Sequence, residues 1–225
     1  SLGYVISVYW KRLRPIKNYQ KYVLFNSFFP QLSAGPVERI NDIFPQIEKM
    51  TKTSYEDIKK GIFLLSFGFL KKLVVVDRLI YLYGSFSAAP GEFYGIEFLL
   101  YVYMGFFLFY LDISSYTDIA RGLGFIFGIK ISINFNRPYL ALNFHDLWKR
   151  WHITVTSWMR DFIYMPILLK TRNSYLAIVV VYGFFGVWHA ASWNYVYLAI
   201  YYSVVHSLYI VLERIIEDKN RIPPL

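Results

Sequence analysis

The stretch that decides the fold is SYLAIVVVYGFFGVWHAASWNYVYLAIYYSVVHSLYIVL, residues 174–212. These 39 residues include no Asp, Glu, Lys or Arg, although one membrane-spanning helix needs only about 20 apolar residues. The stretch therefore predicts two consecutive spans, joined by a turn near residues 192–194.

The rest of the chain is also typical of an integral membrane protein. Of the 225 residues, 56% are apolar and 21% aromatic, and the mean hydropathy is positive at +0.34. Residues 93–111 form a third candidate span, interrupted only by Glu97. Residues 61–86 form a fourth, interrupted by four charged residues from Lys71 to Arg78. Because a lipid-facing charge is costly, this fourth segment predicts either two short helices or one helix whose charged middle faces protein or water.

Several shorter segments cannot span a bilayer. Pro30 and Pro36 predict that residues 19–36 form short helical pieces lining a cavity. Residues 41–53 are polar and predict an interfacial segment, and Ser54 followed by two acids predicts the start of the next helix.

The sequence after residue 111 also contains short segments. We expect residues 112–128 to form a polar turn and a short helix that re-enters the membrane or lies at its interface, and residues 131–140 to form a loop. Residues 143–164 have a helical pattern in which His145, Trp148 and His152 share one stripe.

Charge and cysteine content exclude several classes of protein. The net charge is +9, and the basic residues lie in short clusters between apolar runs, which is typical of cytoplasmic loops and of contact with anionic membrane lipids rather than with nucleic acid. The absence of cysteine excludes disulfides, thiolate metal sites and a cysteine nucleophile. Without a repeat or a long linker, residues 1–225 predict a single membrane domain, which we expect to be part of a longer chain.

Two histidines in tryptophan-rich apolar sequence are the candidate catalytic residues. His152 lies in DLWKRWHITVTSWMRDF (146–162) and His189 lies in GFFGVWHAASW (183–193). A membrane-embedded histidine costs free energy unless it is paired, solvated or used in chemistry. The four histidines are too few for a di-iron site, and the spacing of His145 and His152 is uncommon for zinc ligands, so we expect no metal and no tightly bound cofactor.

A general base in an apolar tunnel fits these histidines best. Transfer of an acyl group from a thioester to a hydroxyl requires removal of the hydroxyl proton, and a neutral imidazole suits that step. In this interpretation His189 is the base, and His152 orients a substrate, bonds a carbonyl or relays a proton. The alternative is that either imidazole merely bonds a backbone carbonyl, which is the role that we expect for His145 and His206.

Other residues are weaker candidates for the substrate path. Polar and aromatic side chains around the two histidines predict a tunnel wall or a donor contact; they are Trp148, Arg150, Trp151, Asn136 and Asp161. Trp188, with the neighbouring aromatic residues Phe184 and Phe185, favours a narrow passage for a short acyl group.

Four segments together resemble the membrane-bound O-acyltransferase family. They are FFPQLSAGPVERINDIFPQI (28–47), DISSYTDIARGLGFIFG (112–128), NFNRPYLALNFHDLWKRWHITVTSWMRDFIYMPI (134–167) and GVWHAASWNYVYLAIYYSVVHSLYIVLER (186–214). They occur in the family's order and cover most of the chain. The sequence is most similar to the bacterial branch that includes the alginate O-acetyltransferase membrane subunit and the teichoic-acid D-alanyl transfer protein.

This resemblance implies a fold and an activity. The implied fold is all-α: a polytopic transmembrane helical bundle with short re-entrant or interfacial helices around a tunnel, in the bacterial inner membrane. The implied reaction moves an acyl group, which we expect to be acetyl, from a cytoplasmic thioester such as acetyl-CoA or an acyl carrier protein to a hydroxyl of an exported cell-envelope polysaccharide or a related acceptor. The resemblance also implies that His189 is the catalytic histidine and that His152 is the second histidine of the family.

A second function remains open. A non-catalytic membrane subunit would conduct the acyl group or glycan to a separate periplasmic or extracellular transferase. Such a conduit needs a polar path but no buried neutral base, so the pH dependence of transfer discriminates between the two functions.

Overall fold

The computed structural model describes residues 2–32, 35–49, 53–88, 91 and 93–220. Every regular element within these ranges is a helix, which confirms the all-α prediction. The chain packs as two compact units, residues 1–136 and 137–225, and each is described by itself. The single membrane domain stays a prediction.

The first unit begins with short helices separated by breaks. They are α1 (Leu2–Tyr9), α2 (Tyr19–Ser27), a 3₁₀ turn (Phe29–Gln31) and α3 (Ile40–Glu48). The Asn18 side chain caps α2 by accepting a hydrogen bond from the Lys21 amide, and Pro30 lies in the turn that follows α2. The described part of residues 19–36 therefore confirms the predicted helical pieces. The predicted interfacial segment 41–53 contains most of α3, and residues 50–52 lie outside the described ranges.

Helix α3 carries the core of this unit. Ile40, Ile43 and Ile47 are buried on one face of α3, at the spacing that places side chains above one another. They belong to a cluster that also includes Phe25, Phe28, Ala120, Ile129 and Ile131. Side chains at both ends of α3 hold residues 130–132 against it. Gln46 Oε1 accepts a bond from the Lys130 amide at 2.7 Å, and the Glu38 carboxylate accepts bonds from the Ser132 amide and hydroxyl at 2.6 and 3.0 Å.

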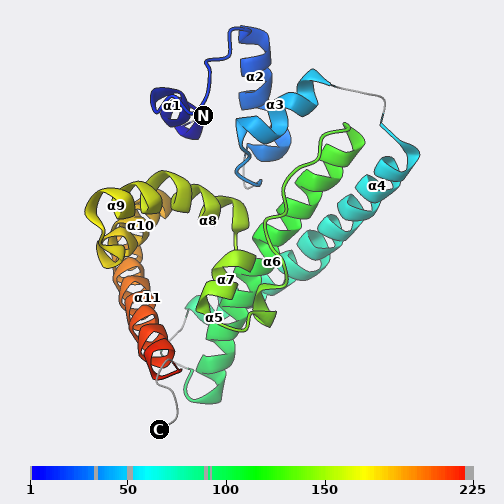
Figure 1. The fold of residues 1–225 in the computed structure, drawn as a ribbon. Coiled ribbons are helices and arrows are strands. Elements are labelled where there is room, and N and C mark those ends of the chain that lie inside the picture. Colours follow the sequence, from blue (N-terminus) through cyan, green and yellow to red (C-terminus); the bar gives the residue numbers. More distant parts are fainter. Residues whose placement is uncertain (1, 33–34, 50–52, 89–90, 92, 221–225) are drawn as a thin grey trace. The chain divides into compact units, whose positions relative to one another are not determined.

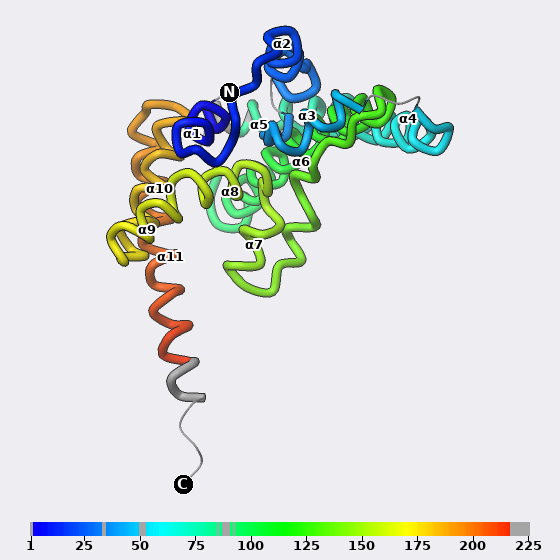
Figure 2. The backbone as a smooth tube through the Cα atoms, turned by 45° about the horizontal axis from the view of Figure 1, so that its top comes forward, coloured from blue at the N-terminus to red at the C-terminus, as the bar shows by residue number. Residues whose placement is uncertain are grey.

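The remainder of the first unit is a long helical hairpin. One arm consists of α4 (Tyr55–Phe69), a π-helical segment (Leu70–Val76) and α5 (Asp77–Ala88). The other arm is α6 (Ile96–Ile126), which runs alongside α4 in both views of the chain (Figures 1 and 2). As predicted, Ser54 caps α4, since its hydroxyl accepts a bond from the Asp57 amide.

The charged middle of the first arm faces protein, as one of the two alternatives for residues 61–86 predicted. Lys71 Nζ lies 2.6 Å from Asp118 Oδ2 and 2.6 Å from Ser114 Oγ, and Lys72 Nζ lies 2.6 Å from Asp112 Oδ1. The lysines lie in the π-helical segment and their partners lie on α6. Pairing across the hairpin allows these charges to lie inside an otherwise apolar arm.

Helix α6 corrects the expectation for residues 93–128. A span ending near residue 111 and a separate turn and short helix were predicted, but α6 is one helix of 31 residues. The polar residues did not break the helix because their side chains have partners. Asp112, Ser114 and Asp118 bond the two lysines, and the Ser115 hydroxyl donates to the Asp112 carbonyl oxygen. The predicted loop at 131–140 is confirmed, apart from a short 3₁₀ turn at Pro138–Leu140.

The second unit contains three short helices followed by two longer ones. They are α7 (Phe144–Arg150), α8 (Ile153–Met159), a π-helical turn (Arg160–Tyr164), α9 (Met165–Thr171), α10 (Ser174–His189) and α11 (Trp193–Asn220). Helices α10 and α11 pack against each other (Figure 1). The bend between them includes Ser192, which confirms the predicted turn.

The single helix predicted over residues 143–164 is interrupted. Trp151 is extended, and His152 has a left-handed backbone with φ 45° and ψ 49°. The break falls where the β-branched run Ile153–Thr156 begins, and such residues lose side-chain freedom in a helix. The Thr156 hydroxyl bonds the Trp151 carbonyl oxygen at 3.0 Å, which gives that oxygen a partner at the break.

Two of the described helices are long and apolar enough to cross a membrane. They are residues 96–126 and 193–216, and Ser174–His189 is a shorter apolar helix.

Candidate active site

A cavity of about 490 Å³ lies in the second unit. Its walls come from the short helices α7 and α8 and from α10 and α11, and apolar side chains such as Val155, Ile178 and Phe185 form much of the lining. Three imidazoles, those of His145, His152 and His206, also reach this cavity. The combination of an apolar wall with a few convergent polar groups is typical of a small-molecule site.

His152 occupies the break between α7 and α8. A left-handed backbone is uncommon for a residue other than glycine and costs of order 1–3 kcal/mol, so local packing must fix this residue in place. It lies outside the two candidate spans. Burial, and to a smaller extent the charge of a protonated His189, lower the pKa of His152 to about 4. The imidazole is therefore neutral at pH 7 and able to accept a proton or a hydrogen bond.

His189 is the last residue of α10, where the helix ends before the turn to α11. Its ring is surrounded by aromatic rings: Phe185 at a centroid distance of 4.2 Å, Trp188 at 4.9 Å and Tyr195 in parallel stacking at 5.6 Å. The half-buried His189 is not among the described residues that line the cavity, but its ring contacts Phe185, which is part of that lining. The structure thus places His152 in the cavity wall and His189 against Phe185, a side chain of the same wall.

The weaker candidate residues divide into two groups. Trp148 and Trp151 line the cavity, and the buried Trp148 indole nitrogen has no hydrogen-bond partner within the described part of the chain. Arg150 and Asp161 instead form ion pairs: Arg150 Nε lies 2.8 Å from Asp146 Oδ2, and Asp161 Oδ1 lies 2.9 Å from Arg160 Nε. A donor contact by either residue would compete with these pairs.

Two further candidates are not brought to the cavity. Trp188 is 53% exposed and contacts the rings of Phe185 and His189. Asn136 is an exposed residue of the first unit, so a role for it in the site stays a prediction. The described residues include no group of three or more His, Asp or Glu side chains placed to hold a metal ion.

Comparison with known proteins identifies the family. Residues 11–220 match the membrane-bound O-acyltransferase family. The chain belongs to this family. Because the match covers nearly the whole chain, it includes both histidines and both units.

Three relatives with different acceptors show which members of the family this chain is similar to. The peptidoglycan O-acetyltransferase of Helicobacter pylori is 33% identical over 86% of this chain and 38% of its own length. A probable alginate O-acetylase of Azotobacter vinelandii is 30% identical over 95% of this chain and 42% of its own length. The teichoic acid D-alanyltransferase of Bacillus subtilis is 29% identical over 84% of this chain and 51% of its own length. The chain spans about two fifths to a half of the length of these relatives.

Sequence reasoning missed the arrangement of the other two histidines. His145 and His206 were expected to bond backbone carbonyls, but both line the cavity and bond side chains. His145 Nε2 lies 3.1 Å from Glu213 Oε2, and the Tyr209 hydroxyl donates to Glu213 Oε1 at 3.0 Å. His206 Nδ1 lies 3.1 Å from the Tyr182 hydroxyl oxygen. The i, i+3, i+7 spacing of His206, Tyr209 and Glu213 was the available signal, because it places all three on one face of α11.

Proposed function

We propose that the protein is an O-acyltransferase of the bacterial inner membrane. It transfers an acyl group, which we take to be acetyl, from a cytoplasmic thioester to a hydroxyl of an exported cell-envelope polysaccharide or a related acceptor. The donor is acetyl-CoA or an acyl carrier protein, and the reaction uses no tightly bound cofactor. Membership of the family supports the reaction class, and relatives named for peptidoglycan, alginate and teichoic acid support a cell-envelope acceptor.

The main support for this proposal is an apolar cavity that is lined by His152 and by Phe185, against whose ring His189 packs. His189 is the general base, and His152 is its partner, which orients a substrate or relays a proton. The lowered pKa of His152 keeps that imidazole neutral at physiological pH. Such a neutral group can accept a hydrogen bond without burying a charge in an apolar wall.

The reaction needs no covalent enzyme intermediate. As the acceptor oxygen attacks the thioester carbonyl carbon, His189 takes the hydroxyl proton; the carbon–sulfur bond then breaks, and the sulfur leaves with a proton from the imidazolium. The products are an ester and a free thiol. Holding both substrates together supplies much of the rate, because orientation replaces a bimolecular encounter.

We further propose that the whole protein is a multi-pass helical bundle in which this cavity forms part of a tunnel through the membrane. Two long apolar helices and the shorter apolar α10 support this architecture. The aromatic residues around His189 would narrow the passage, which favours a short acyl chain.

The test is transfer of radiolabelled acetyl from acetyl-CoA or acetylated carrier protein by membranes that contain the full-length protein. Peptidoglycan, alginate and teichoic acid fragments serve as separate acceptors. We expect label to enter one acceptor as a base-labile ester. Failure of every donor and acceptor pair, with the protein present and inserted, would contradict the proposed reaction.

A conduit that hands the acyl group to a periplasmic or extracellular transferase is the second candidate function. A cavity through the membrane would suit it equally well, but its transfer step needs no base. Transfer by a histidine base falls as that histidine is protonated, whereas conduction shows no such titration. The pH profile of the purified protein without its partner separates the two.

A further inference from the structure

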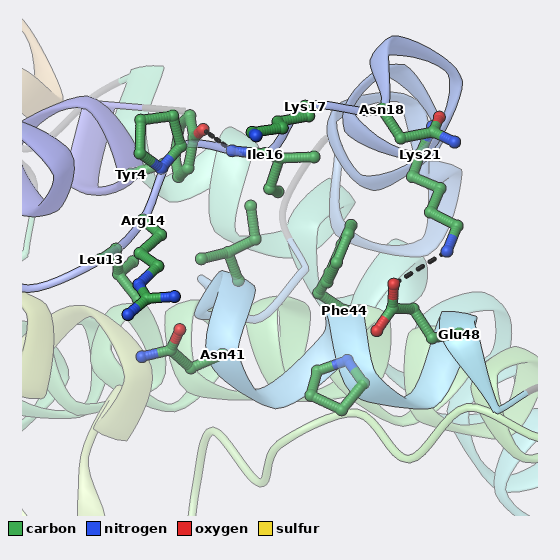
Figure 3. A pocket seen from close by; sticks show the side chains of 13 residues that line it. Tyr4, Leu13, Arg14, Ile16, Lys17, Asn18, Lys21, Asn41, Phe44 and Glu48 are labelled. Carbon is green, nitrogen blue, oxygen red and sulfur yellow. Dashed lines mark hydrogen bonds and ion pairs between the residues drawn. The ribbon is translucent and has the colours of Figure 1, made fainter.

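A second cavity, of about 540 Å³, lies in the first unit between the start of the chain and α3. Figure 3 shows Arg14 and Asn41 at one end of it, Lys21 and Glu48 at the other, and Phe44 between them. None of the residues predicted for acyl transfer lines this pocket. It therefore needs an explanation of its own.

The pocket is basic. Arg14, Lys17 and Lys21 line it with a single acid, Glu48. Lys21 Nζ and Glu48 Oε1 pair at 2.8 Å, whereas Arg14 and Lys17 are exposed and have no ion pair within the described part of the chain. Residues 1–37 contain five basic residues and no acid. The two unpaired cations thus belong to a segment with an excess of positive charge, which attracts an anion.

The pocket is also apolar between its charged ends. Leu13, Ile16, Ile40 and Phe44 contribute to its lining. A hydrogen bond from the Ile16 amide to the Tyr4 hydroxyl, 2.9 Å long, holds the basic loop against α1 (Figure 3). A ligand that fills this pocket needs an anionic group for Arg14 and Lys17 and a hydrocarbon part for the apolar side chains.

The neighbouring elements favour a membrane lipid as that ligand. Helix α1 contains no charged residue, and its Leu2 and Val5 side chains are 55% and 56% exposed. In a membrane protein an exposed apolar helix face lies against lipid chains. Trp10, over which the Arg12 guanidinium lies at 4.5 Å, follows α1 directly, and tryptophan is enriched at the level of the lipid head groups. The pocket thus lies beside residues typical of the membrane interface.

We propose that this pocket binds the phosphate head group of an anionic phospholipid, with Arg14 at the phosphate, Lys17 adding positive charge at the rim of the pocket, and a lipid chain along Leu13, Ile16 and Phe44 (Figure 3). Arginine and lysine are the usual partners of phosphate. The Lys21–Glu48 ion pair closes the opposite end and does not take part. The site is independent of acyl transfer, so it stands or falls separately from the proposed enzymatic function.

The experiment is native mass spectrometry of the full-length protein purified in detergent, with phosphatidylglycerol or phosphatidylcholine added. We expect retention of phosphatidylglycerol in preference to phosphatidylcholine. The double variant Arg14→Gln/Lys17→Gln should bind phosphatidylglycerol about tenfold or more weakly, since each basic residue near an anionic lipid contributes about fivefold. The control Lys59→Gln/Lys60→Gln removes the same charge from exposed positions of α4 and should bind as the wild type does.

Two further measurements distinguish a lipid phosphate from free inorganic phosphate as the ligand. Phe44→Asn leaves the charges in place but removes an apolar contact, so it should weaken phosphatidylglycerol binding. Excess inorganic phosphate should displace little lipid. Equal losses in the two double variants, or complete displacement by inorganic phosphate, would overturn the proposal. Circular dichroism and elution volume establish that each variant is folded before its binding is compared.

Discussion

His145 Nε2 lies 3.1 Å from Glu213 Oε2, so an imidazole at the start of the short helix α7 is tied to a carboxylate near the end of α11. The same carboxylate accepts a hydrogen bond from Tyr209. This arrangement fixes the orientation of one ring in the cavity wall, in the way that a third group orients the histidine of a catalytic triad. The His145–Glu213 contact thus joins α7, which ends before His152, to α11, which follows His189.

We expect Glu213→Gln to affect transfer more than stability. The His145 and Glu213 side chains are 43% and 40% exposed, so their pairing contributes only about 1 kcal/mol or less to the free energy of unfolding. Release of the imidazole should nevertheless lower the transfer rate several-fold. Rates at matched membrane levels, together with thermal unfolding, check both parts. Tyr209→Phe, which keeps the carboxylate, is the milder comparison, and an unchanged rate in Glu213→Gln would show that the pair is only structural.

Gly186→Ala should displace the end of α10 that carries His189. A Cβ at residue 186 would lie 2.8 Å from the Tyr195 carbonyl oxygen on α11, which is closer than packed atoms allow. Gly183, one turn earlier, has no atom within 4 Å of the same position. We expect transfer to fall at least tenfold in Gly186→Ala, whereas Gly183→Ala keeps full activity and gains about 0.5–1 kcal/mol in stability from its higher helix propensity. Activity and melting temperature of both variants are the measurements, and equal behaviour would refute the close packing.

The pH dependence conferred by His152 should appear well below neutrality. Because burial and the neighbouring His189 lower its pKa to about 4, the ring stays neutral at pH 5–7. The unfolded chain takes up the proton near its ordinary value of 6.5, so stability falls as the pH drops from that value towards 4 and is insensitive to this group above it. His152→Gln should flatten this fall. Urea unfolding at a series of pH values measures this loss of stability. If His152→Gln loses as much stability as the wild type over the same pH range, the loss is due to another group.

The contribution of Glu38 to folding stability should depend on pH in the opposite direction to that of His152. Burial raises the pKa of this carboxyl above its ordinary value of 4.5, although the bonds from Ser132 partly oppose the shift. The folded chain therefore holds a proton that the unfolded chain releases, and stability falls as the pH rises through this range. Glu38→Gln should abolish that fall. Glu38→Ala, by contrast, leaves the Ser132 amide without its partner and should cost about 1–3 kcal/mol at every pH. The same change of stability with pH in Glu38→Gln and in the wild type would contradict the assignment.

The sequence predicted the apolar helices better than it predicted their lengths. The uncharged run at residues 174–212 identified α10, α11 and the turn between them, because the cost of a charge in lipid is independent of tertiary detail. Of these two helices, only α11 is long enough to cross a membrane, since α10 ends at His189 and is shorter than the predicted span. The continuity of α6 through Ser114 and Asp118 was not predictable, since it depends on Lys71 and Lys72 of another helix. The break at His152 was missed for a related reason: the helical stripe from His145 to His152 persists across it, although packing overrides the helix there.

The candidate site was predicted in part. Motif resemblance pointed to His152, which lines the cavity, and to His189, whose ring contacts the cavity residue Phe185. Their catalytic roles stay predictions. The motifs did not identify Glu213, whose role is visible only when α7 and α11 meet at the cavity. Among the weaker candidates, Trp148 and Trp151 line the cavity, whereas Arg150 and Asp161 are engaged in local ion pairs.

The role of His189 as general base is tested by the rate of acceptor-dependent acetyl transfer in His189→Ala of the full-length protein, compared with the wild type and His152→Ala at equal membrane levels. If His189 is the base, its removal should abolish transfer while the thioester still binds, and His152→Ala should reduce the rate. Wild-type transfer by His189→Ala would contradict the account and assign the chemistry to another group or to a partner enzyme.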